Sequence, residues 1–295
     1  MADPRDKELE RSPEARILAE HALVALLDKL DGAEAEFVVL GGLVPEVLVG
    51  GQVPPAPGHL GTADVDILLV SHLTMGEDLG HVELALKSIG FEPGDGGWRW
   101  RGVIEGKGMK MEFLCDLETH REYELVPIEG CSELRAQNLR GTGYVAQDWA
   151  WEKLEASLPD GRLVSVEVRF AKLGGYLLSK LVTVRDRGAA KDFYDLAYVL
   201  LHNRAGGPRE AAEVLLAGHL RDSLPALRSI LIEVRERYRI PTTLGPQGFA
   251  TQSLLLDPEL DESELRADAV AAVREFLDAL EDGLERWTKK PRRTA

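Results

Sequence analysis

The residues of this chain with the clearest chemical potential are two carboxylates, Asp64 and Asp66, at the head of an apolar run over residues 64–70. Successive side chains of a strand point to opposite faces, so both carboxylates project from the same face of the predicted strand. Like charges on one face repel each other unless a positive charge lies between them. A divalent cation that prefers oxygen ligands, Mg²⁺ or Mn²⁺, would supply that charge. The alternative is an acidic strand end with no catalytic role.

A second apolar run lies upstream of this pair and ends in Gly41 and Gly42. Because glycine has no Cβ, a strand that ends in glycine lets another group approach the backbone closely. Together with the two carboxylates, these glycines predict a site for phosphate and metal.

A predicted hairpin over residues 98–115 supplies a third carboxylate. On its returning strand the odd-numbered residues form a wholly apolar face, whereas Glu112 lies on the other face. The strand of Asp64 and Asp66 shows the same division. We therefore expect a sheet with one face under helices and the other carrying acids, where Glu112 completes a three-carboxylate cluster. Asp116 has the same strand parity and is the alternative third member.

The second half of the chain contributes a lysine and a carboxylate from two predicted helices. Asp192 and Asp195 are three residues apart and share a helix face. Asp195 is flanked by apolar and aromatic residues, so it is expected to be partly buried and to need a cationic partner, for which Lys180, Arg185 and Lys191 are available. One interpretation is an ion pair that only ties two helices together. The functional one is that Lys180 faces phosphates and Asp195 orients it.

Hydrophobic periodicity and turn residues predict the elements that position these groups. Ser12 and Pro13 predict the N-cap and first turn of a helix that ends at Gly32. Residues 50–58 and 241–261 are predicted to be mostly loop, and residues 149–158 fit either a strand or a helix. The remaining predictions are strands over residues 36–40, 64–70, 98–103, 109–115 and 163–168, and helices near residues 43–49, 76–88, 170–184, 190–203, 207–217, 221–237 and 263–287.

Length and charge limit the class of protein. The 295 residues are enough for one large domain or two ordinary ones. The order of the predicted elements indicates an α+β chain, with a sheet domain over residues 12–168 and a helical domain over residues 169–290 whose Lys180 and Asp195 would complete the active site. The net charge of −15 argues against a broadly basic nucleic-acid surface, although residues 160–204 hold eight Lys and Arg against five Asp and Glu. Two cysteines, the lack of a long apolar run and a charged N-terminus favour a cytoplasmic protein with no membrane partner.

The candidate residues form an ordered set of motifs: Gly41-Gly42, Thr62-x-Asp64-x-Asp66, Lys180-Leu181 and Lys191-Asp192-x-x-Asp195-Leu196. This set resembles the nucleotidyltransferase family of AbiEii-type toxins, within the DNA polymerase β-like nucleotidyltransferase superfamily. Members of the MenT type are toxins that add nucleotides to tRNA. The resemblance spans residues 36–202, and it implies a polymerase β-like mixed sheet with helices on one face, followed by a helical C-terminal domain.

The resemblance also implies a role for each residue. Asp64, Asp66 and Glu112 would hold Mg²⁺ or Mn²⁺, Lys180 would bind the NTP phosphates, and Asp195 would hold Lys180. The family's Gly-Ser is Gly41-Gly42 here, so backbone N–H groups and Thr62 would contact the nucleotide instead of a serine hydroxyl. Arg185, Arg187 and Lys191 would contact the acceptor. The implied activity is transfer of NMP from an NTP to an acceptor hydroxyl, the tRNA 3′ end, by a toxin with a cognate antitoxin as partner.

Two other functions fit the same residues. The acidic composition favours a small-molecule acceptor such as an aminoglycoside, whereas the basic segment over residues 162–204 favours RNA. A non-catalytic member that binds nucleotide or a partner protein is the third possibility. Trp98 and Trp100 alternate on one predicted strand and would either stack a base or pack within the sheet.

Overall fold

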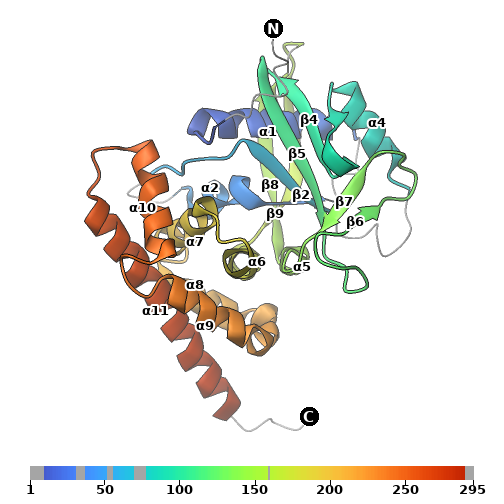
Figure 1. Ribbon diagram of the computed structural model, residues 1–295. Helices are drawn as coiled ribbons and strands as arrows, with labels where there is room; N and C mark the ends of the chain where they lie inside the picture. Colours follow the sequence, from blue (N-terminus) through green and yellow to red (C-terminus); the bar gives the residue numbers. More distant parts are fainter. Residues whose placement is uncertain (1–9, 31–36, 52–55, 70–77, 159, 290–295) are drawn as a thin grey trace. The chain divides into compact units, whose positions relative to one another are not determined.

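The computed structural model describes residues 10–30, 37–51, 56–69, 78–158 and 160–289 as an α+β fold with a mixed, open sheet (Figure 1). The chain divides into two compact units. The first, here the sheet unit, comprises Met1–Glu46 and Gly58–Tyr176, and the second, the helical unit, comprises Val47–Pro57 and Leu177–Ala295. Segment Val47–Pro57 joins the helical unit through distant partners, since the Tyr198 hydroxyl donates a hydrogen bond to the carbonyl oxygen of Pro57 at 2.7 Å.

The sheet runs in the order β3-β4-β5-β2-β1-β9-β8, and β7 pairs with both β5 and β6. The pairs β2–β5, β1–β9 and β5–β7 are parallel and the others are antiparallel. The strands are β1 (Phe37–Leu40), β2 (Asp64–Leu69), β3 (Glu92–Pro93), β4 (Arg99–Ile104), β5 (Lys107–Cys115), β6 (Leu125–Pro127), β7 (Arg135–Asn138), β8 (Trp149–Ser157) and β9 (Leu163–Ala171).

Short helices and one longer helix accompany the sheet. They are α1 (Pro13–Leu27), the 3-10 turn η3 (Gly41–Leu43), α4 (Gly80–Ser88), the 3-10 turn η4 (Asp95–Gly97) and α5 (Gly143–Gln147). Helix α2 (Val44–Val49) begins in the sheet unit and ends in the helical unit. The predicted cap of α1 is confirmed, because the Ser12 side chain accepts a hydrogen bond from the Ala15 N–H at 3.1 Å. The helix ends at Leu27, and Gly32, where the sequence predicted its end, lies outside the described residues.

The predicted division of the sheet into an apolar and a polar face is confirmed. Val65, Ile67, Met111 and Phe113 are fully buried on one face. Helix α1 lies against that face (Figure 1), where its Val24 and Ala25 pack on Ala156 and Leu158. Burial of these apolar side chains is the main stabilising term for the sheet. The opposite face carries the half-buried charged residues Asp64, Asp66, Lys110 and Glu112.

The hairpin of β4 and β5 and the ambiguous segment at residues 149–158 are both resolved by the strand pairing. Glu105 and Gly106 connect β4 to β5 with φ angles of 49° and 78°, as a type I′ turn requires. Residues 149–157 form β8, which pairs with β9 along its whole length. The choice of strand over helix agrees with the alternation of exposed and more buried side chains along β8.

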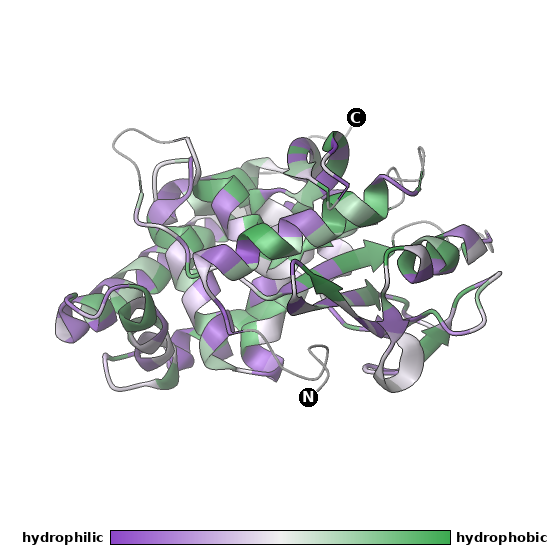
Figure 2. Ribbon diagram, turned by 90° about the horizontal axis from the view of Figure 1, so that it is seen from above, coloured by the Kyte–Doolittle hydropathy of each residue, from purple (hydrophilic) through white to green (hydrophobic). Residues whose placement is uncertain are grey.

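The helical unit contains α7 (Ala190–His202), α8 (Pro208–Ala217), the 3-10 segment η5 (His219–Leu227), α9 (Arg228–Arg237), α10 (Leu244–Leu256) and α11 (Glu262–Lys289). Helix α6 (Leu173–Asp186) begins in the sheet unit and ends in the helical unit. Figure 2 shows hydrophobic and hydrophilic residues alternating along the helices, as helices with one buried face require. Among the described residues, none of the helices combines the length and the apolar character needed to cross a membrane.

Helix α10 contradicts the loop predicted over residues 241–261. Its glycines weaken the helical signal, but close packing requires them. A Cβ on Gly245 would lie 2.7 Å from the ring of Tyr238, and a Cβ on Gly248 would lie 3.0 Å from the ring of Phe193. Tertiary packing therefore outweighs the low intrinsic helix propensity of this segment.

Candidate active site

Asp64 and Asp66 project from the polar face of β2, as their spacing predicts. Both side chains are half-buried, and Asp66 pairs in register with Leu40 of β1 and with Glu112 of β5. Residues paired across neighbouring strands point to the same face, so Asp66 and Glu112 stand side by side. The two aspartates follow each other along one strand with a Cα separation of about 7 Å. These carboxylates form the acidic part of the candidate site.

The two glycines after β1 accommodate residues of the neighbouring strand. Gly41 has a φ of +72°, and a Cβ built on it would lie 1.8 Å from Oδ2 of Asp66. A Cβ on Gly42 would lie 2.5 Å from Cβ of Thr62. The carboxylate of Asp66 therefore rests directly on the Gly41 backbone, a position that only glycine permits. The close approach expected from the sequence is present, and the groups that approach are Asp66 and Thr62.

Thr62 is buried and shapes the start of β2. Its hydroxyl accepts a hydrogen bond from the Asp64 N–H and donates one to the Asp64 carbonyl, both at 3.2 Å. These bonds fix the backbone from which the Asp64 side chain projects. Thr62 thus supports Asp64, and its predicted contact with a nucleotide remains a prediction.

Glu112 has a cationic partner that the sequence analysis did not foresee. Arg99, its register partner on β4, places Nε and a terminal nitrogen each 2.7 Å from Oε1 of Glu112. The Arg99 guanidinium also lies 4.5 Å above the ring of Trp98. In the described part of the chain there is no group of three or more His, Cys, Asp or Glu side chains arranged to hold a metal ion. The carboxylates of Asp64, Asp66 and Glu112 are neighbours but do not form such a group.

Asp116, the alternative third carboxylate, has a structural role at the end of β5. Its Oδ2 accepts hydrogen bonds from the N–H groups of Gly141 and Gly143 at 2.9 and 3.0 Å. Arg140 donates a hydrogen bond to Oδ1 at 3.2 Å. Asp116 thus ties the loop before α5 to the end of the strand.

Of the three basic residues that the sequence makes available to Asp195, Lys180 is the one that pairs with it. Its Nζ donates a hydrogen bond to Oδ2 of Asp195 at 2.7 Å and lies 3.5 Å from Oδ1 of Asp192. Lys180 is 8% exposed, Asp195 2% and Asp192 0%. Arg187 closes the network through two hydrogen bonds of 2.8 and 2.6 Å to Asp192. Buried charges of this kind persist because each has a hydrogen-bonded counter-charge.

Burial and charge act in opposite directions on the acids of this network. Burial favours the neutral form of Asp192, but the charges of Lys180 and Arg187 together hold the pKa of Asp192 below its ordinary value. Burial first, and then the negative charges of Asp192 and Asp195, raise the pKa of Tyr238 well above its usual range. The hydroxyl of Tyr238 donates a hydrogen bond to the carbonyl of Phe193 at 2.7 Å. The cluster is therefore a buried lysine–carboxylate centre within the helical unit.

The other basic residues predicted to contact an acceptor differ in their surroundings. Arg187 is held by Asp192, and Arg185 pairs with the neighbouring Asp186 at 2.9 Å. Lys191 is half-buried at the start of α7. Their contact with an acceptor remains a prediction.

Comparison with known proteins adds no relative. No family model, no curated protein and no solved structure matches this chain. The resemblance to nucleotidyltransferases therefore rests on the ordered motifs of the sequence.

The sequence left open whether Trp98 and Trp100 stack a base or pack within the sheet, and the structure answers this for Trp100. Trp100 is fully buried and donates a hydrogen bond from Nε1 to the Gly97 carbonyl at 3.0 Å, so it packs within the sheet.

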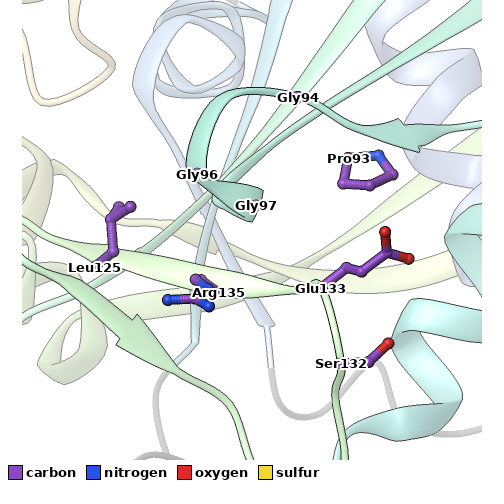
Figure 3. Close-up of a pocket in the computed structure, with 8 residues that line it drawn as sticks. All are labelled: Pro93, Gly94, Gly96, Gly97, Leu125, Ser132, Glu133 and Arg135. Atoms are coloured by element: carbon purple, nitrogen blue, oxygen red, sulfur yellow. The ribbon is translucent and has the colours of Figure 1, made fainter.

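A shallow hollow of about 360 Å³ lies between the turn at residues 94–97 and the strand that carries Arg135 (Figure 3). None of the predicted site residues lines this hollow, and its Glu133 pairs with Lys87.

The metal implied by the resemblance can be tested against these side chains. Mg²⁺ usually binds through one or two carboxylates, and substrate phosphates and water supply its other oxygens. Asp64 and Asp66, on one face beside a glycine backbone, fit that demand. Glu112 would serve as a third ligand only by leaving Arg99. The residues therefore fit a two-carboxylate magnesium site rather than a cage of three.

Proposed function

We propose that this chain is a magnesium-dependent nucleotidyltransferase with a polymerase β-like fold, which transfers NMP from an NTP to an acceptor hydroxyl. The tRNA 3′ end is the proposed acceptor, and the proposed biological role is that of a toxin with a cognate antitoxin. The observation that carries the proposal is the packing of Asp66 on Gly41, with Asp64 on the same strand face. A carboxylate pair beside a glycine backbone suits a metal-bound triphosphate better than it suits a purely structural strand end.

In the proposed reaction the acceptor oxygen attacks the α-phosphorus, and the bond between that phosphorus and the β-phosphate oxygen breaks to release pyrophosphate. Magnesium, when bound, would offset negative charge on the attacking and leaving oxygens. Asp64 and Asp66 would hold it. Lys180 would neutralise the β- and γ-phosphates, and Asp195 would hold the Lys180 ammonium in one position. The hydroxyl proton would pass to a carboxylate of the site, for which Glu112 is the candidate once it is released from Arg99.

The test is direct. Purified protein is incubated with each α-labelled NTP, Mg²⁺ and total tRNA, and labelled RNA is the expected product. Asp64→Ala should abolish labelling without unfolding the chain, because Asp64 is half-buried on the polar face. Glu118→Gln, which changes an exposed carboxylate of the same unit, is the matched control and should label tRNA normally. Labelling by Asp64→Ala equal to that of the unaltered chain would contradict the proposal.

The small-molecule alternative is supported by the net charge of −15, which disfavours long polyanions. The same assay with an aminoglycoside in place of tRNA separates the two. Label on the aminoglycoside alone would favour the small-molecule acceptor. Saturable NTP binding without any labelled product would favour a non-catalytic nucleotide-binding protein.

A further inference from the structure

An arginine and two tryptophans form a platform on the β8–β9 hairpin. The Arg169 guanidinium lies 4.1 Å from the ring centroid of Trp149 and 5.2 Å from that of Trp151. The two indoles meet edge to face, with centroids 5.7 Å apart and an interplanar angle of 78°. Trp151 is 46% exposed, although an indole ordinarily gains free energy from burial. Trp149, Trp151 and Arg169 together form the Trp–Arg platform.

The strand register places the Trp–Arg platform on the same sheet face as the acidic pair. Trp151 pairs with Arg169, Arg169 with Val38, and Val38 with Leu68. Leu68 lies two residues beyond Asp66 on β2 and so shares its face. Strands β8, β9, β1 and β2 are consecutive in the sheet, so the platform lies about 14 Å across the strands from the carboxylates. All of these residues belong to the sheet unit.

The surroundings of the Trp–Arg platform favour a nucleobase over a protein partner. The hairpin face continues from Trp151 with Lys153 and Glu155, whose side chains are 63% and 49% exposed. A protein interface of ordinary size needs an apolar centre, and charged residues interrupt the face here. An exposed indole beside a guanidinium instead offers a stacking surface for a base and a positive charge for the adjoining phosphate.

We propose that the Trp–Arg platform stacks unpaired bases of a single-stranded RNA and thereby holds the acceptor strand of the transfer. This assignment rests on the proposed function for its purpose, but RNA binding at the platform is measurable without any transfer. Sequence specificity is not required, because every base has a π-face that stacks on an indole.

The experiment measures binding of a fluorescein-labelled single-stranded RNA to the full chain by fluorescence anisotropy, without NTP. Trp151→Ala should weaken binding by about fivefold or more, and Trp151→Phe should restore most of it because a ring remains. Leu163→Ala is the matched control. Leu163 is 71% exposed and belongs to the same hairpin face, but it lies at the opposite end from the platform, so RNA affinity should not change.

Failure of this inference differs from failure of the proposed function. Equal RNA affinity of Trp151→Ala and the unaltered chain, or no RNA binding by the unaltered chain, would overturn the platform assignment. If the chain labels tRNA, Trp151→Ala should raise the KM for RNA while the KM for NTP and kcat stay unchanged. If the chain labels no RNA but Trp151→Ala still weakens RNA binding, the result supports RNA binding at the Trp–Arg platform and contradicts the proposed transfer reaction.

Discussion

Replacement of Lys180 by Met should destabilise the helical unit strongly, because it removes a buried ammonium and leaves its carboxylate partners in place. The Lys180 ammonium lies 2.7 Å from Asp195 and 3.5 Å from Asp192. Lys180 is 8% exposed, Asp195 2% and Asp192 0%. Methionine keeps the apolar stem of the side chain, so the change isolates the charge. Asp192 retains Arg187, whereas Asp195 loses the ammonium that donates to it.

Loss of one partner from a buried ion pair costs about 3–5 kcal/mol, since the other charge stays in a poorly solvated place. The double variant Lys180→Met/Asp195→Asn removes that charge as well. It should regain more than half of the lost free energy of unfolding, so that the two substitutions are strongly non-additive. Arg209→Met is the control, because Arg209 and Glu275 form an exposed pair in the same unit at 3.5 Å and should contribute less than about 1 kcal/mol.

Urea unfolding followed by far-UV circular dichroism is the assay, because α7–α11 of the helical unit supply most of the helical signal. The measured quantity is the free energy of unfolding of that unit for the two single variants, the double variant and the control. A loss below about 1 kcal/mol for Lys180→Met, or strictly additive single and double variants, would refute the reasoning that Lys180 and Asp195 form a buried pair.

Further predictions concern the sheet unit. Gly41→Ala should abolish nucleotide transfer and cost about 1–3 kcal/mol in stability, because a Cβ at φ +72° collides with Asp66; an unaltered transfer rate would contradict this. Glu112→Gln should leave Mg²⁺ affinity within about twofold of the original in a calorimetric titration, since Glu112 is held by Arg99; a loss comparable to that of an Asp66 variant would show that it is a ligand. Burial alone would raise the pKa of Glu83, but its hydrogen bonds lower that pKa from 4.5 to about 2. Glu83 therefore contributes roughly 3 kcal/mol to the free energy of unfolding. This contribution is present above about pH 4.5 and is lost as the pH falls toward 2. Glu83→Gln should remove this acid-dependent part in unfolding curves measured across that range; the same acid dependence in the variant would contradict the assignment.

The polar and apolar faces of the sheet could be predicted because strand periodicity is a local property of the sequence. Alternation over residues 64–69 and 109–115 fixes which side chains share a face, and the register then brings Asp66 next to Glu112. Lys180 and Asp195 could be paired because a carboxylate among aromatic residues on a buried helix needs a nearby cation. Each of these predictions depends on a pattern within a few residues.

The missed features depend on contacts between distant residues. Arg99 could not be assigned to Glu112 without the register of β4 and β5, which the turn at Glu105 determines. Helix α10 was missed because Gly245 and Gly248 lower its intrinsic propensity, and only the packing of Tyr238 and Phe193 explains them. The Trp–Arg platform required knowledge that residues 149–157 form a strand rather than a helix.

The membership of Val47–Pro57 in the helical unit has a consequence for synthesis of the chain. Pro57 receives its hydrogen bond from Tyr198, 141 residues later, and the Leu48 carbonyl accepts one from the Arg204 N–H. A ribosome that adds about 5–20 residues per second needs on the order of ten seconds to make that stretch. During this interval the segment has been made, whereas its partners Tyr198 and Arg204 have not. The nascent chain is then exposed to chaperones and proteases at a point early in its length.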